Sequence, residues 1–516
     1  MFLLRVSDIR IDFNWKMISD PLYGYVYFNV EVEEPIINTL LLQRLRYILQ
    51  LQTAHLVYPG AVHTRFQHSL GVLHLSGLVA EDLVFKVISM YGKHVLEDYE
   101  PATLIEATRL VGLLHDVGHA AFSHAFEHTI LWKRSLPPEV ANHERIGVKL
   151  VNQLLGDLIE KADKTLPGLK DAVYALLNLE EPRGIFRLFR WIVKDGPYPT
   201  DVLDFLRRDS YYAGTPEYGY VSYERLYKNT YPLISGSKVA LVLDRIALGG
   251  FRQYMHAKAS MYEHVYYHSV CRSFDKILYK ILDELDEELG LTRRVLGILK
   301  GDPRGYLELT DTLLYSVMMR KALYEDSGEV GRLCRRLLVE RKPEFRRVGR
   351  DIIISTRSPD LVRITLKLAV NVEYKRKVVS EIEEYLADHV KSTGLFREDI
   401  WVDVLDVTPL PRSLIYPGGE EPRLTQVFYI GKKVDKNIVV SEEYNVLKED
   451  FPLEVIFRVY VKREKYSGDL EAKLPPILLN AVKSVLGIEE KIEEKFEVKF
   501  EELVSSEDIE KYKLTM

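Results

Sequence analysis

Cysteine is nearly absent from this chain, since Cys271 and Cys334 are the only two among 516 residues. Two cysteines provide no disulfide framework and no CxxC pair for a zinc site, so a reducing, cytoplasmic setting is expected. The sequence also lacks an apolar run of about 18 residues, and its first residues, MFLLRVSDIRIDFNWK, lack the pattern of a signal peptide. Neither a membrane span nor a membrane partner is therefore expected.

Glycine-rich phosphate loops are missing as well. No Walker-type motif is present, and no GxGxxG follows a strand-like run. The formal net charge of -6 gives no whole-protein attraction to nucleic acid. Phosphate chemistry would thus depend on a metal ion and basic side chains, which favours metal-assisted hydrolysis over a nucleotide-driven motor. Abundant charge (28% of residues) and 32 tyrosines with scarce cysteine are typical of a thermophile.

The stretch LLHDVGH places an adjacent His-Asp pair, His115 and Asp116, in an apolar, helix-patterned run. Imidazole suits zinc, iron and nickel, whereas carboxylate suits magnesium and manganese. Neighbouring side chains on a helix diverge by about 100°, so further ligands must come from elsewhere, and His68 and Asp201 are available. Two imidazoles and two carboxylates leave coordination positions open, which is typical of a catalytic rather than a sealed structural metal.

Histidine density supports a functional cluster. The chain has 14 histidines, and one short region holds His115, His119, His124, His128 and His143. A lone histidine in an apolar helix is usually a satisfied core residue, but this density favours a shared site. An unpaired carboxylate between Leu114 and Val117 would also be costly to bury.

Periodicity predicts a mainly α fold with a helical body and a smaller C-terminal α+β lobe. The expected segments are a strand-and-turn segment at 1–35, a helical body at 36–330, an α+β lobe at 331–480 and a charged tail at 481–516.

Within these segments, apolar residues at three- and four-residue spacing predict helices over 36–54, 101–117 and 119–132, and one long helix over 238–290. Pro409–Pro411 predicts a loop. Short runs rich in Val, Ile and Tyr predict strands at 351–356, 361–370, 400–407, 424–432 and 454–462.

Several motifs in this order resemble the HD-domain phosphohydrolases: RFQHSLG at 65–71, LLHDVGHAAFSH at 113–124, NHE at 142–144 and DVLDFLRRD at 201–209. DPLYGYV near residue 20, QRLRYILQL at 43–51, YYHSVCRSFDKIL near 267 and FRVYVK at 457–462 follow the same order. The set is most similar to the deoxynucleotide triphosphohydrolase branch, which includes the vertebrate SAM-and-HD-domain enzymes. The resemblance extends from about residue 18 to 470, and no SAM domain is expected.

The resemblance assigns roles position by position. It implies metal ligands at His68, His115, Asp116 and Asp201. It implies catalytic and phosphate-contacting residues at His143, Glu127, His124 and His119, with Glu127 standing where the family usually has Asp. It implies substrate contacts at Arg65, Gln50, Leu51, Asp209 and Tyr266, of which Tyr266 and Leu51 would exclude a ribose 2′-hydroxyl.

The implied activity is cleavage of dNTPs to a deoxynucleoside and inorganic triphosphate. The implied cofactor is one divalent transition metal, Fe, Mn, Zn or Ni, with Mg or Mn accompanying the substrate phosphates. His143, oriented by Glu127, would protonate the departing 5′-oxygen or assist proton transfer. Arg65, together with His119 and His124, would neutralise charge developing on the triphosphate.

Regulation by a bound nucleotide within a homo-oligomer, a dimer or tetramer, is also implied. The positions matching effector contacts are Asn38, Gln43, Arg46, Arg225, Arg458 and Lys462. Asn38 stands where that branch has an Asp that reads guanine, and an amide offers only one acceptor oxygen. A different effector, or none, is therefore expected.

Two other functions stay open. HD proteins also hydrolyse nucleoside monophosphates, alarmones and cyclic nucleotides, although Arg65 with several histidines favours a polyphosphate. The arginine-rich stretch RLCRRLLVERKPEFRRVGR at 332–350 could attract single-stranded nucleic acid. It contains only one aromatic residue, Phe345, so base stacking has little support and a nucleic-acid partner is not expected.

Overall fold

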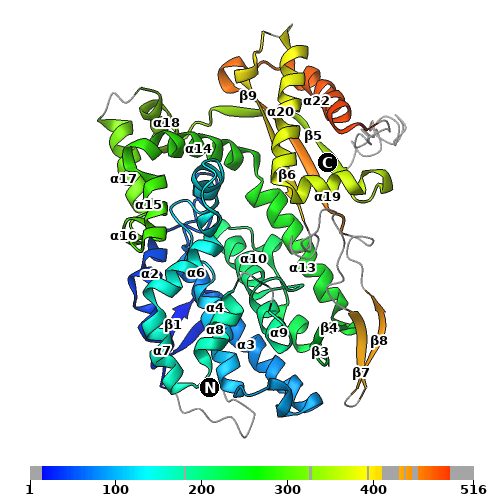
Figure 1. The fold of residues 1–516 in the computed structure, drawn as a ribbon. Coiled ribbons are helices and arrows are strands. Elements are labelled where there is room, and N and C mark those ends of the chain that lie inside the picture. Colours follow the sequence, from blue (N-terminus) through cyan, green and yellow to red (C-terminus); the bar gives the residue numbers. More distant parts are fainter. Residues whose placement is uncertain are drawn as a thin grey trace, which may run out of the picture.

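The computed structural model describes residues 14–178, 180, 182–324, 328–391, 394–408, 429–434, 437–443 and 451–488. Over these residues the fold is mainly α, with a helical body and a smaller C-terminal lobe that contains sheet, as the sequence predicts (Figure 1). The loop expected at Pro409–Pro411, residues 424–428 of one expected strand and residues 489–516 of the expected tail lie outside the described residues.

The N-terminal segment forms an antiparallel hairpin of β1 (Trp15–Asp20) and β2 (Gly24–Asn29). The single helix predicted over 36–54 is wrong, because the chain there is divided into short pieces. These are α1 (Glu33–Ile37), α2 (Leu40–Gln43) and the 3-10 turns η1 (Arg44–Tyr47) and η2 (Ala54–Leu56). Thr39 has an extended backbone, with φ −78° and ψ 154°, which ends the helical path despite the apolar spacing.

Two long helices form the centre of the body. Helix α3 (Arg65–Tyr91) begins with a capping box, in which the side chains of Thr64 and Gln67 satisfy each other's backbone amides. Helix α4 (Pro101–Leu114) is buried along its whole length and packs against α3. Pro101 occupies its first turn, where a missing amide costs no hydrogen bond. The His-Asp pair therefore lies just beyond α4, and the helix predicted over 101–117 is three residues too long.

Further helices pack around α3 and α4 (Figure 1). In chain order they are α5 (His124–Phe126), the π-helical turn η4 (Glu127–Trp132), α6 (His143–Leu154), α7 (Gly156–Thr165), α8 (Leu169–Leu177), α9 (Ile185–Val193), α10 (Thr200–Ala213), α11 (Pro216–Gly219) and α12 (Tyr223–Lys228). After a hairpin follow α13 (Leu248–Met261), η7 (Tyr262–Tyr266), α14 (Ser269–Leu289), α15 (Leu291–Gly297), α16 (Arg304–Leu307), α17 (Asp311–Leu323) and α18 (Gly328–Leu338).

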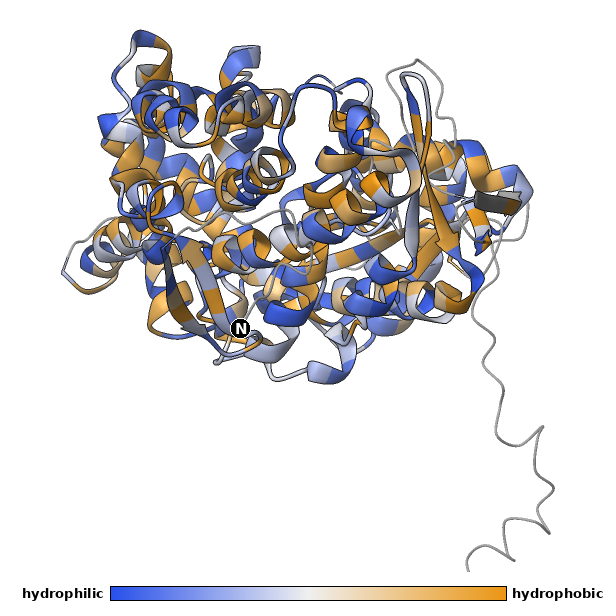
Figure 2. Ribbon diagram, turned by 90° about the horizontal axis from the view of Figure 1, so that it is seen from below, coloured by the Kyte–Doolittle hydropathy of each residue, from blue (hydrophilic) through white to orange (hydrophobic). Residues whose placement is uncertain are grey.

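Amphipathic spacing explains most of these helices. Helix α14 buries Phe274, Ile277, Ile281 and Leu285, which recur every three or four residues on one face. Figure 2 shows the matching pattern, with hydrophobic and hydrophilic residues interleaved along the helices. None of the described helices combines the length and apolar character needed to cross a membrane.

The long helix predicted over 238–290 is interrupted at residues 267–268, between η7 and α14, and is wrong at its start. Residues there form a hairpin of β3 (Thr230–Ser235) and β4 (Lys238–Asp244), joined by a two-residue turn. Gly236 has φ +57°, which suits such a turn because glycine has no Cβ. Strand β4 also pairs in parallel with β7 (Tyr429–Val434), which pairs with β8 (Asn437–Glu443). One four-stranded sheet thus combines a hairpin from the middle of the chain with a hairpin from its C-terminal part.

The C-terminal lobe contains an antiparallel sheet in the order β5 (Phe345–Ser355), β9 (Glu454–Lys462), β6 (Ile400–Val407). Helices α19 (Val362–Val370), α20 (Val372–His389) and α22 (Leu470–Leu486) pack against it (Figure 1). The strand predicted over 361–370 is wrong, since this is α19. Its buried residues follow helical spacing, so packing has overridden the β propensity of its Val, Ile and Thr residues.

Lys86 of α3 joins the hairpin to the body. Its ammonium donates to the carbonyl oxygens of Tyr227, Lys228 and Thr230 and pairs with Asp82. Replacing it with Met would leave these acceptors buried without their donor. We expect Lys86→Met to lower the free energy of unfolding by about 3 kcal/mol, measured by urea denaturation. Lys93→Met, which removes an exposed pair with Glu100, should change it by less than about 1 kcal/mol.

Candidate active site

One face of α10 carries a row of charged side chains. Asp201, Asp204 and Arg208 are three and four residues apart, so they lie along the same side of the helix. Asp201 lies in the first turn, where the helix dipole stabilises negative charge. Asp204 and Arg208 are completely buried, whereas the side chain of Asp201 is 32% exposed. The row thus runs from the interior to an accessible surface.

The four predicted metal ligands lie together. Nε2 of His68 is 3.2 Å from Nε2 of His115 and 3.1 Å from Oδ1 of Asp201. Nε2 of His115 is 3.5 Å from the same Asp201 oxygen and 3.4 Å from Oδ1 of Asp116. Oδ2 of Asp116 is 3.8 Å from His68. Helices α3, α4 and α10 each bring part of this set to one point.

The hydrogen bonds of the two imidazoles point their lone pairs at each other. His68 donates from Nδ1 to Asp204 at 2.8 Å, and His115 donates from Nδ1 to the Gly112 carbonyl at 2.8 Å. In its neutral form, with the proton on Nδ1, each ring presents an Nε2 lone pair. Two facing lone pairs and two carboxylates repel one another unless a cation lies between them. This donor set fits a divalent metal ion, with the outer partners fixing the ring orientations.

The pKa shifts show how strongly the cluster attracts positive charge, because a proton on Nε2 of His68 takes the place that a metal ion would take. Burial would lower the pKa of His68, but Asp201 and Asp204 outweigh it and raise the pKa to about 10. Burial would raise the pKa of Asp116, but the guanidinium of Arg65, which contacts it directly, holds the pKa below its usual range. The cluster therefore attracts a positive charge strongly, whether a proton or a metal ion.

A second cluster adjoins the first. Glu127, in η4, accepts from Nδ1 of His143 at 2.7 Å and from Nδ1 of His124 at 3.0 Å. It also accepts from the His143 backbone amide at 2.9 Å. The carboxylate of the longer Glu side chain therefore reaches both imidazoles. Burial would lower the pKa of His143, but Glu127 reverses the effect and raises it.

His119 completes the second cluster. Its ring stacks on that of His143 with centroids 3.8 Å apart, and its Nε2 is 3.5 Å from Asp116. Burial and the nearby Arg65 and His143 lower its pKa well below the usual value. The imidazole is therefore neutral and would offer a hydrogen bond rather than a charge. The stacked rings of His119 and His143 cannot both aim their in-plane lone pairs at one ion. The three histidines His119, His124 and His143 are therefore poorly suited to a second metal site.

Gly118 allows the two clusters to meet. A Cβ at this position would lie 1.9 Å from the His143 carbonyl oxygen and 2.5 Å from the Gly147 amide nitrogen. Only glycine lets the loop after the His-Asp pair lie directly against the start of α6. That helix begins with Asn142, whose side chain accepts from the Arg145 amide.

Asp209, one of the predicted substrate contacts, accepts two side-chain hydrogen bonds. Tyr266 donates to its carboxylate at 2.7 Å, and His63, which the sequence reading missed, donates at 2.8 Å. Leu51 is partly buried against the core. Oε1 of Gln50 is buried with no hydrogen-bond partner among the described residues. An acceptor left in this state is suited to a ligand.

The described contacts do not join the predicted effector residues into a single group. Arg46 donates to Gln43 at 2.8 Å near the N-terminal segment, where Asn38 is exposed. Arg225 donates to the Ile246 carbonyl. On β9, Arg458 is buried against Asp351, and Lys462 pairs with Asp399 at 3.2 Å. Internal acidic partners thus already hold the cations of Arg458 and Lys462.

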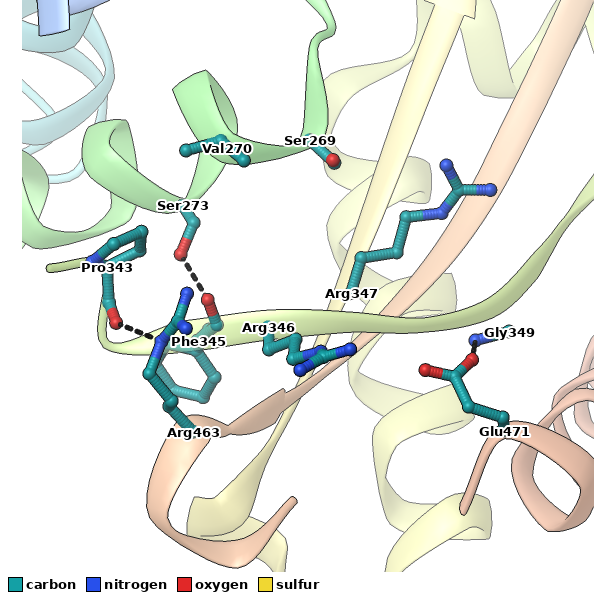
Figure 3. Close-up of a pocket in the computed structure, with 10 residues that line it drawn as sticks. All are labelled: Ser269, Val270, Ser273, Pro343, Phe345, Arg346, Arg347, Gly349, Arg463 and Glu471. Carbon is teal, nitrogen blue, oxygen red and sulfur yellow. Dashed lines mark hydrogen bonds between the residues drawn. The ribbon is translucent and has the colours of Figure 1, made fainter. Parts of the chain in front are cut away.

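A basic cavity of about 500 Å³ lies between the start of α14 and β5, away from both clusters (Figure 3). Arg346, Arg347 and Arg463 line it together with Glu471. Burial lowers the pKa of Arg463, and the neighbouring cations Arg346 and Arg336 lower it further. Glu471 accepts from the Gly349 amide. The lining therefore carries an excess of positive charge that suits an anion.

Asp204 is the main site residue that the sequence reading missed. It accepts from His68 and is held by Arg208, which also pairs with Asp20 at 2.8 Å. Its spacing from Asp201 on α10 was the signal that could have identified it. Buried carboxylates beside metal-binding histidines orient the ring and raise its basicity.

Comparison with known proteins supports the family resemblance. The family model for the HD domain matches residues 65–184, which confirms the resemblance to HD-domain proteins over that part of the chain. The uncharacterized protein YwfO of Bacillus subtilis is 30% identical over 269 residues, 52% of this chain and 55% of that protein. A deoxynucleoside triphosphate triphosphohydrolase SAMHD1 homolog of Dictyostelium discoideum is 25% identical over 442 residues, 83% of this chain and 75% of that protein.

These matches span between about half and three quarters of the relatives' own lengths. Among solved structures, a hypothetical protein from Aquifex aeolicus aligns with a TM-score of 0.61 and 24% identity. The alignment covers 89% of this chain and 100% of that one, and it shows a shared fold.

The hydrogen bond from His68 to Asp204 leads to a prediction. We expect Asp204→Asn to weaken divalent metal binding by about 10- to 100-fold, because the amide orients His68 less firmly and leaves it less basic. Metal titration with elemental analysis would measure the change. Asp302→Asn, at an exposed residue paired only with Arg304, should bind metal like the wild type. Equal affinity in both variants would contradict the role given to Asp204.

Proposed function

We propose that the protein is a metal-dependent phosphohydrolase that cleaves dNTPs to a deoxynucleoside and inorganic triphosphate. The observation that carries this proposal is the adjacency of two clusters, one suited to a metal and one rich in imidazole. Arg65 contacts Asp116 of the first cluster and donates to Ser123, the residue before His124 of the second. One cation, one guanidinium and several imidazoles within a small region suit a substrate with several phosphates.

The metal would be held by His68, His115, Asp116 and Asp201. When bound, a divalent ion would polarise a phosphate oxygen and lower the pKa of a water molecule. Fe, Mn, Zn and Ni all suit this mixed set of imidazole and carboxylate ligands, and Mg or Mn would accompany the substrate phosphates. The partial exposure of Asp201 supports access for a substrate on that side.

His143 is proposed as the general acid. Glu127 raises its pKa, which favours the protonated ring that a departing 5′-oxygen requires. The exposed His124, held by the same carboxylate, would contact the triphosphate, and neutral His119 would donate one hydrogen bond. Arg65 would bind phosphate oxygens with its planar guanidinium.

Selection of a deoxyribose is proposed to depend on Asp209, Tyr266 and Leu51. His63 and Tyr266 both donate to Asp209, so the carboxylate has a fixed position from which to accept from a sugar hydroxyl. The ring of Tyr266 and the side chain of Leu51 would then exclude a 2′-hydroxyl. The buried oxygen of Gln50 would accept one further hydrogen bond from the substrate.

Regulation by a second nucleotide, within a homo-oligomer, forms part of the proposal. The basic cavity beside β5 supports it, because three arginines around about 500 Å³ suit phosphate groups (Figure 3). The exposed Asn38, Arg46 and Arg225, with Gln43, would contribute further contacts. Arg458 and Lys462 would first have to leave Asp351 and Asp399.

A nucleic-acid-binding role gains no support from the arginine-rich stretch. Arg332 pairs with Glu329 and Glu344, and Arg336 pairs with Glu464. These internal ion pairs reduce the charge that a phosphate backbone would meet.

The substrate is tested with a panel of dNTPs, rNTPs, dNMPs and an alarmone, each with Mn²⁺ or Mg²⁺ and with or without a second nucleotide. We expect a deoxynucleoside and intact triphosphate from dNTPs, separated by chromatography. Asp201→Ala should reduce turnover by at least about 100-fold, because a metal ligand is lost. Hydrolysis of a different compound would reject the dNTP assignment, and full activity of Asp201→Ala would reject the metal site.

The general acid is tested by the pH profile of kcat. A general acid must be protonated, so the rate should fall as pH rises through the pKa of His143. Glu127→Gln removes the charge that raises this pKa, so the fall should move to lower pH and the neutral rate should drop by about 10²- to 10³-fold. Glu144→Gln, at a more exposed carboxylate with a smaller effect on His143, is the matched control and should keep both rate and profile.

A further inference from the structure

The loop between α4 and α5 carries functional residues at both ends but has no regular secondary structure. It runs from His115 to Ser123, and only a few turn bonds, such as those between His119 and Asp116 and between Ser123 and Ala120, satisfy its backbone internally. Buried backbone groups outside helices and strands need other partners. Side chains from distant parts of the chain supply them.

Two of these side chains act as donors. Arg44, only 1% exposed, donates to the carbonyl oxygens of Val117 at 3.2 Å and His119 at 2.8 Å. Tyr306, fully buried, donates to the carbonyl oxygen of Gly118 at 2.6 Å. Three consecutive carbonyl groups of the loop are thus fixed by residues from η1 and α16.

Asp311 acts as the acceptor at the far end of the loop. It is 2% exposed, and its two carboxylate oxygens accept from the backbone amides of Phe122 at 2.7 Å and Leu49 at 3.0 Å. Leu49 directly precedes Gln50 and Leu51. One carboxylate at the start of α17 therefore joins the loop before His124 to the segment proposed to contact the sugar.

The loop adopts strained backbone where Asp311 holds it. Phe122 has φ +56° and Ser123 has φ +49°, a region that costs energy for residues with a Cβ. Ser123 in turn accepts from Nε of Arg65 at 2.7 Å, and Arg65 contacts Asp116. The strained backbone at Ser123 thus fixes the position of Arg65 between the two clusters.

We propose that Arg44, Tyr306 and Asp311 are positioning residues that hold the loop of residues 117–123, and through it Arg65 and His124, in the geometry the reaction requires. Their described hydrogen bonds to the loop are with its backbone groups and not with the catalytic side chains. The inference rests on the proposed function for its kinetic effect, whereas its effect on the loop can be measured without any substrate.

The test compares Asp311→Asn and Tyr306→Phe with matched controls. Asp286→Asn makes the same change at a buried carboxylate whose described partners, Thr292 and Arg134, lie outside the loop. Tyr254→Phe removes a buried hydroxyl that has no hydrogen-bond partner among the described residues. Hydrogen exchange read by mass spectrometry, metal content and kcat are measured for all four variants and the wild type.

We expect Asp311→Asn to speed exchange in the segments 47–52 and 117–126 by about tenfold or more, because an amide cannot accept from both N–H groups. Its kcat should fall by about 10- to 100-fold with bound metal retained, since small displacements of catalytic groups are costly. Tyr306→Phe should give smaller changes in the same direction, and both controls should leave loop exchange and kcat near wild type.

Tyr306→Phe removes a single oxygen, so it still tests the idea if Asp311→Asn does not fold. Loop exchange at the wild-type rate in the variants that fold would overturn the proposal. So would faster loop exchange with kcat equal to that of the matched control. If the wild type hydrolysed no dNTP, the proposed function would fail, and the exchange data would still decide whether these residues hold the loop.

Discussion

A row of alternating charges runs from Asp20 through Arg208, Asp204 and His68 to Asp201, and the candidate metal site depends on it. The carboxylates of Asp20 and Asp204 and the guanidinium of Arg208 satisfy one another in the interior. Asp204 can therefore remain charged and accept from His68, which turns the ring and directs its lone pair outward. Without this buried chain, no contact would turn the His68 ring so that its Nε2 faces that of His115.

The sequence predicted the candidate metal ligands as a group because they stand in motifs with unusual chemistry. His115 and Asp116 interrupt an apolar run, and a buried charge there needs an explanation. It also predicted the strands at 400–407 and 454–462, whose bounds agree with β6 and β9. Short apolar runs were less reliable, since 361–370 and 238–244 have similar composition but form a helix and a strand. Packing against the rest of the fold decides such cases.

Other parts of the site could not be predicted, because they depend on contacts between residues far apart in sequence. Arg44 reads as one of several cations on an amphipathic segment, yet it is completely enclosed and bound to carbonyl oxygens. Asp311 reads as a helix-starting acid, and its role at Phe122 follows only from the tertiary fold. Glu127 lies where an Asp was expected, and the π-helical turn that contains it accompanies the reach of the longer side chain to both histidines.

The pairing of β4 with β7 has a consequence for how the protein folds. Residues 242–244 find their parallel partners at 429–431, after most of the C-terminal lobe has been synthesised. Until then one edge of the β3–β4 hairpin presents unpaired backbone groups that could pair with another chain. Contacts of such sequence separation form slowly. During synthesis the helical body would therefore emerge with the edge of β4 unpaired and open to other chains. The four-stranded sheet would be completed only when the last quarter of the chain, which contains β7, has been synthesised.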